Sequence, residues 1–211
     1  MAATSTLGSL DLAALLCSRV CHDLISPTGA IVNGLEVLEE SKDDETKTFA
    51  LDLIKKSARQ ASARLQFCRL AFGAAGSAGA EIDLGDAENV ARGFIEDSRT
   101  RLTWQLPRML LAKNRVKLLL NMLLIATQAI PRGGLLTVSP IGSGATMCFR
   151  VVASGLNARV PQAAAGLFAG TSAISIDAHA IQPYYAGLLA RECGLAAAIA
   201  SEGDAVVITA Q

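Results

Sequence analysis

The first third of the chain carries apolar residues at a helical spacing. From Leu10 to Leu38 they recur alternately four and three positions apart, the repeat of a helix that buries one stripe. We call this run the first seam; it consists of Leu10, Ala14, Cys17, Cys21, Leu24, Thr28, Ile31, Leu35 and Leu38. The second seam has the same rhythm and consists of Leu51, Ile54, Ala58, Ala61, Leu65, Cys68 and Phe72. Each seam predicts one long amphipathic helix.

A short polar segment, residues 39–45, separates the two seams and contains no apolar residue. Two amphipathic helices joined by such a turn form an antiparallel hairpin. Further apolar residues widen the apolar face of the first helix beyond its seam: Leu12, Leu15, Leu16, Val20, Ile25, Val32 and Val37. Because a single hairpin leaves much of this surface exposed, we expect a homodimer in which two hairpins form a four-helix bundle. The alternative is that the wide face packs on the second domain of the same chain.

The second domain is separated from the hairpin by residues 74–80, which are all alanine, glycine or serine. We therefore expect a hairpin over residues 1–73, a linker over 74–80 and a second domain over 81–211. In the second domain, patterns predict helices over residues 86–99, with Asp86 as N-cap, 113–130 and 183–193, and strands over 102–106, 135–138, 147–152 and 205–209. These elements predict an α/β sandwich with helices on one face of a mixed sheet, and an α+β fold for the whole chain.

The composition indicates a folded protein and restricts its partners. Of 211 residues, 51% are hydrophobic and 18% are charged, which is unlike a disordered chain. Lysine and arginine number 19, as do aspartate and glutamate, so the chain lacks the basic excess typical of proteins that bind nucleic acid or acidic membranes. The cysteines are odd in number and form no C-x-x-C pair, so we expect buried cytoplasmic thiols at Cys17, Cys21, Cys68, Cys148 and Cys193.

No segment has the pattern of a membrane anchor or a secretory signal. The amino terminus has no basic residues before its apolar stretch. The longest apolar stretch, residues 118–131, contains Asn121, Thr127 and Gln128 and is too short to cross about 30 Å of hydrocarbon. We expect a soluble cytoplasmic protein.

His22 is the candidate residue for chemistry, and its surroundings differ from those of the second histidine, His179. We interpret His179, which has no arranged polar neighbours, as a structural or solvated side chain. His22 follows the seam residue Cys21 by one position, which turns its ring to the edge of the bundle, where water reaches it. Three polar or small residues share its side of the helix and allow another protein to approach: Arg19, Ser26 and Gly29.

Pro27 lies five positions after His22, inside the predicted first helix. A proline in a helix interior lacks the N–H that would bond to the carbonyl of Asp23, and its ring clashes with that turn, at a cost of about 3 kcal/mol. We therefore expect a kink beside His22.

The segment His22-Asp23-Leu24-Ile25-Ser26-Pro27, followed by Ile31, resembles the H-box of sensor histidine kinases. The domain order also resembles the kinase core, in which a dimerisation hairpin precedes a Bergerat-type ATP-binding domain. The second domain departs from that family where the nucleotide binds. Ile125 stands where the magnesium-binding asparagine of the N-box is expected after Asn121, and Ala153 stands in place of the adenine-reading aspartate. An apolar side chain replaces neither group, so we expect a degenerate domain that does not use ATP.

A kinase-like core that keeps the histidine and loses the nucleotide site is similar to the histidine phosphotransferases of alphaproteobacterial phosphorelays. Residues 11–23 and 112–121 resemble that family closely, and the resemblance extends over essentially the whole chain. It implies a phosphorelay intermediate that accepts a phosphoryl group from the receiver domain of a hybrid sensor kinase and passes it to response regulators. In that family the kinase is CckA and the regulators are CtrA and CpdR, which control the cell cycle.

The resemblance implies that His22 carries the phosphoryl group. Asp23 is the second catalytic candidate because it is adjacent in the chain, and Arg19, Ser26 and Gly29 are candidates for partner binding because they share the side of the helix with His22. A histidine side chain with its ordinary pKa of about 6.5 is mostly neutral in the cytoplasm, and so is ready to act as a nucleophile. Asp23 either stabilises the charged imidazole or only pairs with Arg19. Arg19 either attracts the acidic receiver surface or is a solvated helix residue. Ser26 stands where related kinases carry the Thr or Asn used to dephosphorylate regulators.

The chain itself is expected to bind no cofactor and no metal, since the receiver domain brings its own Mg²⁺. A metal site formed by Cys17, Cys21 and His22 is the alternative, but His22 points about 100° away from the seam cysteine that precedes it. Three other functions compete with the relay interpretation: an ATP-dependent kinase, a dimeric scaffold that sequesters response regulators, and a response-regulator phosphatase that uses Asp23 and Ser26.

Overall fold

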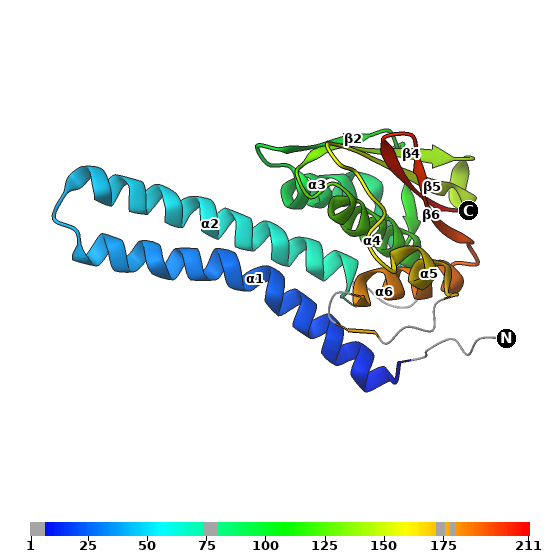
Figure 1. The fold of residues 1–211 in the computed structure, drawn as a ribbon, viewed down its shortest axis with the longest axis horizontal. Helices are drawn as coiled ribbons and strands as arrows, with labels where there is room; N and C mark the ends of the chain where they lie inside the picture. Colours follow the sequence, from blue (N-terminus) through cyan, green and yellow to red (C-terminus); the bar gives the residue numbers. More distant parts are fainter. Residues whose placement is uncertain (1–6, 74–79, 172–175, 178–179) are drawn as a thin grey trace.

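The computed structural model describes residues 7–73, 80–171, 176–177 and 180–211, and it has the two parts that the sequence predicts. A long helical hairpin extends from one side of an α/β domain (Figure 1). The α+β architecture, with the hairpin first and the mixed-sheet domain second, is confirmed. Six of the seven residues of the predicted linker, 74–79, lie outside the described residues, as does His179.

The hairpin consists of α1 (Ser9–Glu40) and α2 (Asp44–Ala71), joined by only three residues. The connection is shorter than the polar segment we expected, because the acidic residues at both ends of that segment continue the helices. Asp43 is the N-cap of α2, and its carboxylate accepts a hydrogen bond from the backbone N–H of Thr46 at 2.8 Å. A hydrogen bond from the Thr46 hydroxyl, together with this backbone bond, lowers the pKa of Asp43.

Small residues make the closest contact between α1 and α2. Pro27 and Gly34 of α1 and Ala50 and Ser57 of α2 are buried. A Cβ on Gly34 would lie 2.7 Å from Cγ1 of Ile54, so the two helices approach closely there because position 34 has no side chain. Six of the nine residues of the first seam and three of the seven of the second are exposed, among them Leu35 and Leu65.

The wide apolar face of α1 is divided between two environments. Its amino-terminal part, with Leu12, Leu15 and Leu16, packs on Ile181 and Tyr184 of the α/β domain. The alternative that this face packs on the same chain is thus correct for that part. The remainder stays uncovered in the single chain, at Ile25, Val32 and Val37.

The α/β domain contains a five-stranded mixed sheet in the order β2-β4-β5-β7-β6. The β2–β4 pair is parallel and the other pairs are antiparallel. The strands of this sheet are β2 (Thr100–Trp104), β4 (Gly134–Ile141), β5 (Cys148–Ser154), β6 (Ala197–Glu202) and β7 (Ala205–Ala210). A separate small antiparallel pair is formed by β1 (Glu81–Asp83) and β3 (Leu110–Ala112).

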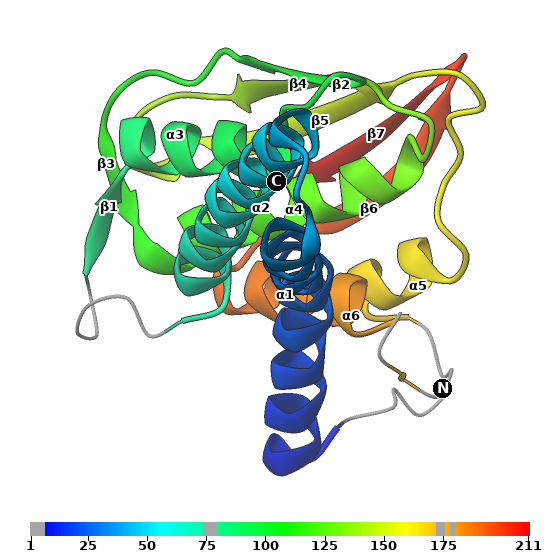
Figure 2. The same cartoon turned by 90° about the vertical axis from the view of Figure 1, so that its left-hand side faces the viewer.

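The helices of this domain lie on the same side of the five-stranded sheet (Figure 2). They are α3 (Leu84–Ile95), α4 (Lys113–Ala129), α5 (Ala164–Ala169) and α6 (Ile181–Glu192), with a 3-10 turn η1 (Gly144–Thr146) between β4 and β5. The central helix α4 is buried from residue 116 to residue 126 and forms the middle of the core together with side chains of β4, β5 and β7. This explains why this stretch is apolar apart from Lys117 and Asn121.

Three details correct the expectations from sequence. Asp83, and not Asp86, is the N-cap of α3, where its carboxylate accepts a hydrogen bond from the N–H of Gly85. Cys17 and Cys21 are exposed in the single chain, and only Cys68 of the five cysteines is fully buried. The elements β1, β3, α5 and β6 were not anticipated, because they are short or alternate weakly. In the part of the chain that the structure describes, no helix has the length and hydropathy needed to span a membrane.

Candidate functional site

His22 lies near the middle of α1, with 80% of its side chain exposed to solvent. Its Nδ1 atom is 3.5 Å from Oδ1 of Asp23, at the long limit of a hydrogen bond. Within the described residues, Nε2 of His22 has no hydrogen-bond partner, so this nitrogen faces solvent. The arrangement leaves one ring nitrogen beside a carboxylate and the other accessible to a second protein.

Asp23 is buried although it is charged, with 8% of its surface exposed. Its Oδ2 atom accepts a hydrogen bond from Nε of Arg19, one turn earlier on α1, at 3.2 Å. The two carboxylate oxygens thus contact different partners, one Arg19 and the other His22. The pairing of Asp23 with Arg19 that the sequence suggested is present, and a role of Asp23 in stabilising the charged imidazole stays a prediction.

The main chain beside His22 is held by a residue of the second helix. Because Pro27 has no N–H, the carbonyl oxygen of Asp23 has no helical donor four residues later. The guanidinium Nη1 of Arg64, on α2, donates a hydrogen bond to this oxygen. Figure 1 shows that α1 bends in its middle and that its amino-terminal half diverges from α2. We attribute the bend to Pro27, as expected from sequence.

Two of the three predicted partner-binding residues are exposed near His22 on α1. Ser26 and Gly29 are both exposed, and a Cβ placed on Gly29 would have no neighbour within 4 Å. Arg19 is largely covered, with 18% of its side chain exposed, because it is paired with Asp23. A partner that reaches His22 therefore meets small side chains on the carboxy-terminal side of the ring.

Arg64 is the residue that the sequence analysis missed. An arginine in an amphipathic helix is normally predicted to be a solvated surface residue. The signal that identifies it is indirect: a proline inside α1 frees a carbonyl group, and a buried carbonyl needs a donor from elsewhere. Only the pairing of α1 with α2 shows that Arg64 is the residue within reach.

The positions where a kinase would bind nucleotide are inside the core. Ile125 and Ala153 are both completely buried. Asn121 is completely buried as well, and its side-chain amide donates to the carbonyl oxygens of Ala71 and Lys117 at 3.1 and 2.8 Å. Its Oδ1 atom accepts a hydrogen bond from the side chain of Gln182. The N-box asparagine that remains thus has an internal structural role.

The cysteines near His22 belong to a different surface. Cys17, Cys21 and Cys68 line a shallow groove between α1 and α2, together with Leu16 and Val20, and His22 is not part of its wall. Burial raises the pKa of the Cys68 thiol to about 11. Among the residues that the structure describes, no three histidine, cysteine, aspartate or glutamate side chains are placed to hold a metal ion.

Comparison with known proteins places these features in one family. Residues 84–205 match the family model of the histidine phosphotransferase C-terminal domain. The chain is 54% identical over 207 residues to the protein phosphotransferase ChpT of Brucella abortus (strain 2308), with 98% of each chain covered. A solved structure of a bacterial phosphotransferase superimposes with a TM-score of 0.88 at 52% identity and covers 99% of both chains. The chain belongs to the histidine phosphotransferase family.

Proposed function

We propose that this protein is the histidine phosphotransferase of a phosphorelay. His22 accepts a phosphoryl group from the receiver domain of a hybrid sensor kinase and passes it to aspartates of response regulators. The observation that carries this proposal is the geometry of His22, whose exposed Nε2 faces solvent while its Nδ1 lies 3.5 Å from the buried carboxylate of Asp23.

The proposed transfer is an in-line displacement at phosphorus. The lone pair of Nε2 attacks the phosphorus of the aspartyl phosphate, a bond between nitrogen and phosphorus forms, and the bond to the aspartate oxygen breaks. The released aspartate leaves as a carboxylate, and Nδ1 keeps its proton, so the imidazole ring becomes positively charged. Asp23 stabilises that charge because its Oδ1 atom lies beside Nδ1. The same geometry serves the reverse reaction, in which a regulator takes the phosphoryl group from His22.

The chemistry requires little more from this chain than position and access. Phosphoryl transfer depends mainly on alignment and on neutralisation of charge, and the receiver domain supplies Mg²⁺ for the second requirement. We propose that the chain binds no metal and no ATP of its own. The complete burial of Ile125 and Ala153 supports this, because neither position offers a polar group to a nucleotide.

We further propose that the protein acts as a homodimer built from two hairpins. An apolar stripe remains exposed along the single hairpin, and we call it the outer stripe; it consists of Ile25, Val32 and Leu35 on one side of α1 and Leu51 and Leu65 on one side of α2, which are between 41% and 69% exposed. Exposed apolar residues in a continuous helical row are typical of a helix-bundle interface. His22 lies beside this row on α1, so dimerisation leaves its ring accessible.

The finer identity of the partners is also a proposal. We infer that the donor is a hybrid kinase of the CckA type and that the acceptors are regulators of the CtrA and CpdR type, which control the cell cycle. The identity of 54% to ChpT along nearly the whole chain supports this assignment. Such a relay operates in the cytoplasm, without nucleic acid or membrane as a partner of this chain.

A reconstituted relay tests the proposal against its competitors. A purified hybrid kinase with its receiver, radiolabelled ATP and a response regulator are incubated with wild-type protein or with His22→Gln. We expect label on the regulator only with the wild type. Labelling of this chain by ATP alone would indicate a kinase. Release of inorganic phosphate without label on this chain would indicate a phosphatase, and binding without any transfer would indicate a scaffold.

A further inference from the structure

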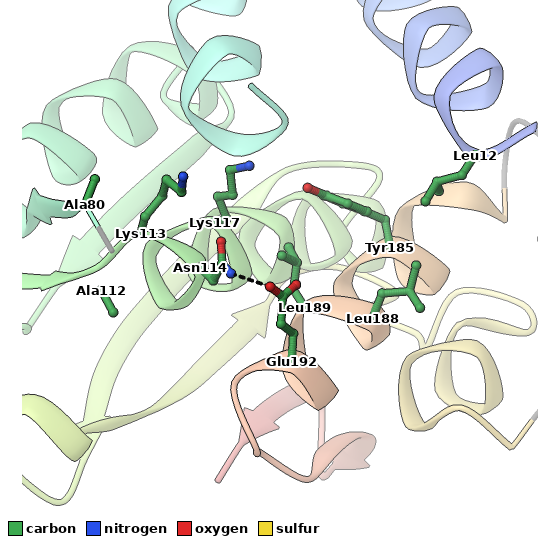
Figure 3. A pocket seen from close by; sticks show the side chains of 10 residues that line it. All are labelled: Leu12, Ala80, Ala112, Lys113, Asn114, Lys117, Tyr185, Leu188, Leu189 and Glu192. Carbon is green, nitrogen blue, oxygen red and sulfur yellow. Dashed lines mark hydrogen bonds between the residues drawn. The ribbon is translucent and has the colours of Figure 1, made fainter. Parts of the chain in front are cut away.

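A cavity of about 860 Å³ lies between the amino-terminal end of α4 and one face of α6. Lys113, Asn114 and Lys117 line it from α4, and Figure 3 shows Asn114 next to Glu192 of α6 and Lys117 on the side of Tyr185. The remaining wall residues are Leu12, Ala80, Ala112, Tyr185, Leu188, Leu189 and Glu192. None of the proposed phosphotransfer residues takes part, so the cavity is separate from the His22 site.

Lys117 is the unusual residue of this wall. It is 8% exposed, and within the described parts of the chain its amino group has no hydrogen bond or ion pair. Burial and the nearby Lys113 lower the pKa of Lys117, against the opposing influence of Glu192. The stem of Lys117 is buried but its Nζ atom keeps some exposure, so the ammonium group reaches the cavity, and within the described residues no anion is paired with it there.

The carboxylate in the same wall does not neutralise this charge by direct contact. The Oε1 atom of Glu192 accepts a hydrogen bond from Nδ2 of Asn114 at 2.8 Å, drawn as the dashed line in Figure 3. α4 begins at Lys113, whose N–H donates to the carbonyl oxygen of Ala80 at 3.0 Å; its N-cap residue, Ala112, offers no side-chain cap to the N–H groups that follow, and these carry the positive end of the helix dipole. The α4 side of the cavity is therefore suited to a negative charge.

The other side of the cavity is apolar. Leu12 of α1 and Leu188 of α6 line it, and Tyr185 adds an aromatic ring. This ring is held in place, because it packs against Phe72 with ring centroids 5.9 Å apart. The cavity thus combines a cationic end with an apolar end, and its volume is that of a typical small-molecule site.

We propose that this cavity binds a small organic anion, in which a phosphate or carboxylate group is attached to an aromatic or aliphatic body. The anionic group pairs with Lys117 at the start of α4, and the body lies against Leu12, Tyr185 and Leu188. This is a ligand site in addition to the proposed phosphotransfer function, and it needs no chemistry at His22.

Phenyl phosphate is a suitable probe, because inorganic phosphate and phenol represent its two halves. Isothermal titration of the wild-type protein should give saturable binding of phenyl phosphate that is tighter than binding of either half. Lys117→Met should weaken it about tenfold or more, because one charge-assisted pair is lost. Lys117→Arg keeps the charge and should retain most of the affinity. Lys42→Met, in the exposed connection between α1 and α2, removes an equal charge elsewhere and should have no effect.

A second variant tests the apolar end independently. Leu188→Ala should reduce the affinity for phenyl phosphate and leave that for inorganic phosphate unchanged. The proposal is overturned if phenyl phosphate does not saturate the wild type, or if Lys117→Met binds it as tightly. Circular dichroism verifies that each variant is folded. If Lys117→Met is unfolded, an equal affinity of Leu188→Ala and wild type for phenyl phosphate overturns the proposal instead.

Discussion

Arg64 of α2 donates a hydrogen bond to the main-chain carbonyl of Asp23 in α1, at the turn that carries the exposed histidine. The bond replaces the helical N–H that Pro27 lacks. It also ties the second helix to the position of His22, because Asp23 is the next residue in the chain. We therefore regard Arg64 as a positioning residue for the imidazole.

The first prediction concerns this replacement. Arg64→Ala should lower the free energy of unfolding by about 1–3 kcal/mol, since it leaves a carbonyl group without its donor. In the background of Pro27→Ala, Arg64→Ala should lower the free energy of unfolding by clearly less, because residue 27 then supplies an N–H to that carbonyl. Urea denaturation of the four proteins in this double-mutant cycle measures the difference.

Arg59→Ala is the matched control, because Arg59 is an exposed arginine on the same helix. It should change stability little in either background. If Arg64→Ala lowers the free energy of unfolding equally with proline and with alanine at position 27, the proposed role of the bond is contradicted.

The second prediction separates the two contacts of Asp23. Asp23→Asn should slow phosphoryl transfer from a receiver to His22 about tenfold or more, which corresponds to roughly 1.4 kcal/mol of lost charge stabilisation. Arg19→Gln removes the other contact of this carboxylate and should slow transfer far less. Single-turnover kinetics with a phosphorylated receiver measure both rates. If the two variants slow transfer equally, Asp23 acts only as the partner of Arg19.

The third prediction concerns the outer stripe and the homodimer. Val32→Glu places a charge in the stripe and should convert the protein to a monomer, as measured by sedimentation equilibrium. Val37 is also exposed, but it follows five residues later and lies about 140° around the helix. Val37→Glu should therefore remain dimeric. A wild-type monomer at micromolar concentration, or a dimeric Val32→Glu, would contradict a bundle formed by this stripe.

The fourth prediction compares two glycines of α1. Gly34→Ala should destabilise the protein by about 1–3 kcal/mol, because the new Cβ would lie 2.7 Å from Cγ1 of Ile54. Gly29→Ala meets nothing within 4 Å and should stabilise the helix by up to about 1 kcal/mol. Urea denaturation gives both values. A destabilised Gly29→Ala together with an unaffected Gly34→Ala would show that the hairpin packs through a different face.

The elements with strong periodicity could be predicted from the sequence. The two seams predicted the helices of the hairpin, and the boundaries of α4 and the positions of β4 and β5 followed from apolar runs between turn residues. The face on which α1 and α2 pack could not be predicted in this way. Small residues such as Gly34 and Ala50 carry little hydrophobic signal, yet they permit the closest approach of the two helices.

The candidate site could be predicted only in part, for a similar reason. His22, Asp23 and the neighbours on their helix follow from local spacing, since residues three and four apart share a helix face. The bond from Arg64 and the pairing of Asn121 with Gln182 join residues 41 and 61 positions apart. No local pattern encodes such contacts. Asp86 was predicted as the cap of α3, but the cap is Asp83. The two aspartates are three residues apart and have the same local cap signal, so the sequence does not distinguish them.

The most direct test of the account is the location of the phosphoryl group. The wild-type protein and His22→Gln are each incubated with a receiver domain labelled with radioactive phosphate on its aspartate, and the chains are separated. We expect label on the wild type that is lost in acid and retained in base, as for phosphohistidine, and no label on His22→Gln. Equal labelling of His22→Gln, or acid-stable label on the wild type, would contradict the account.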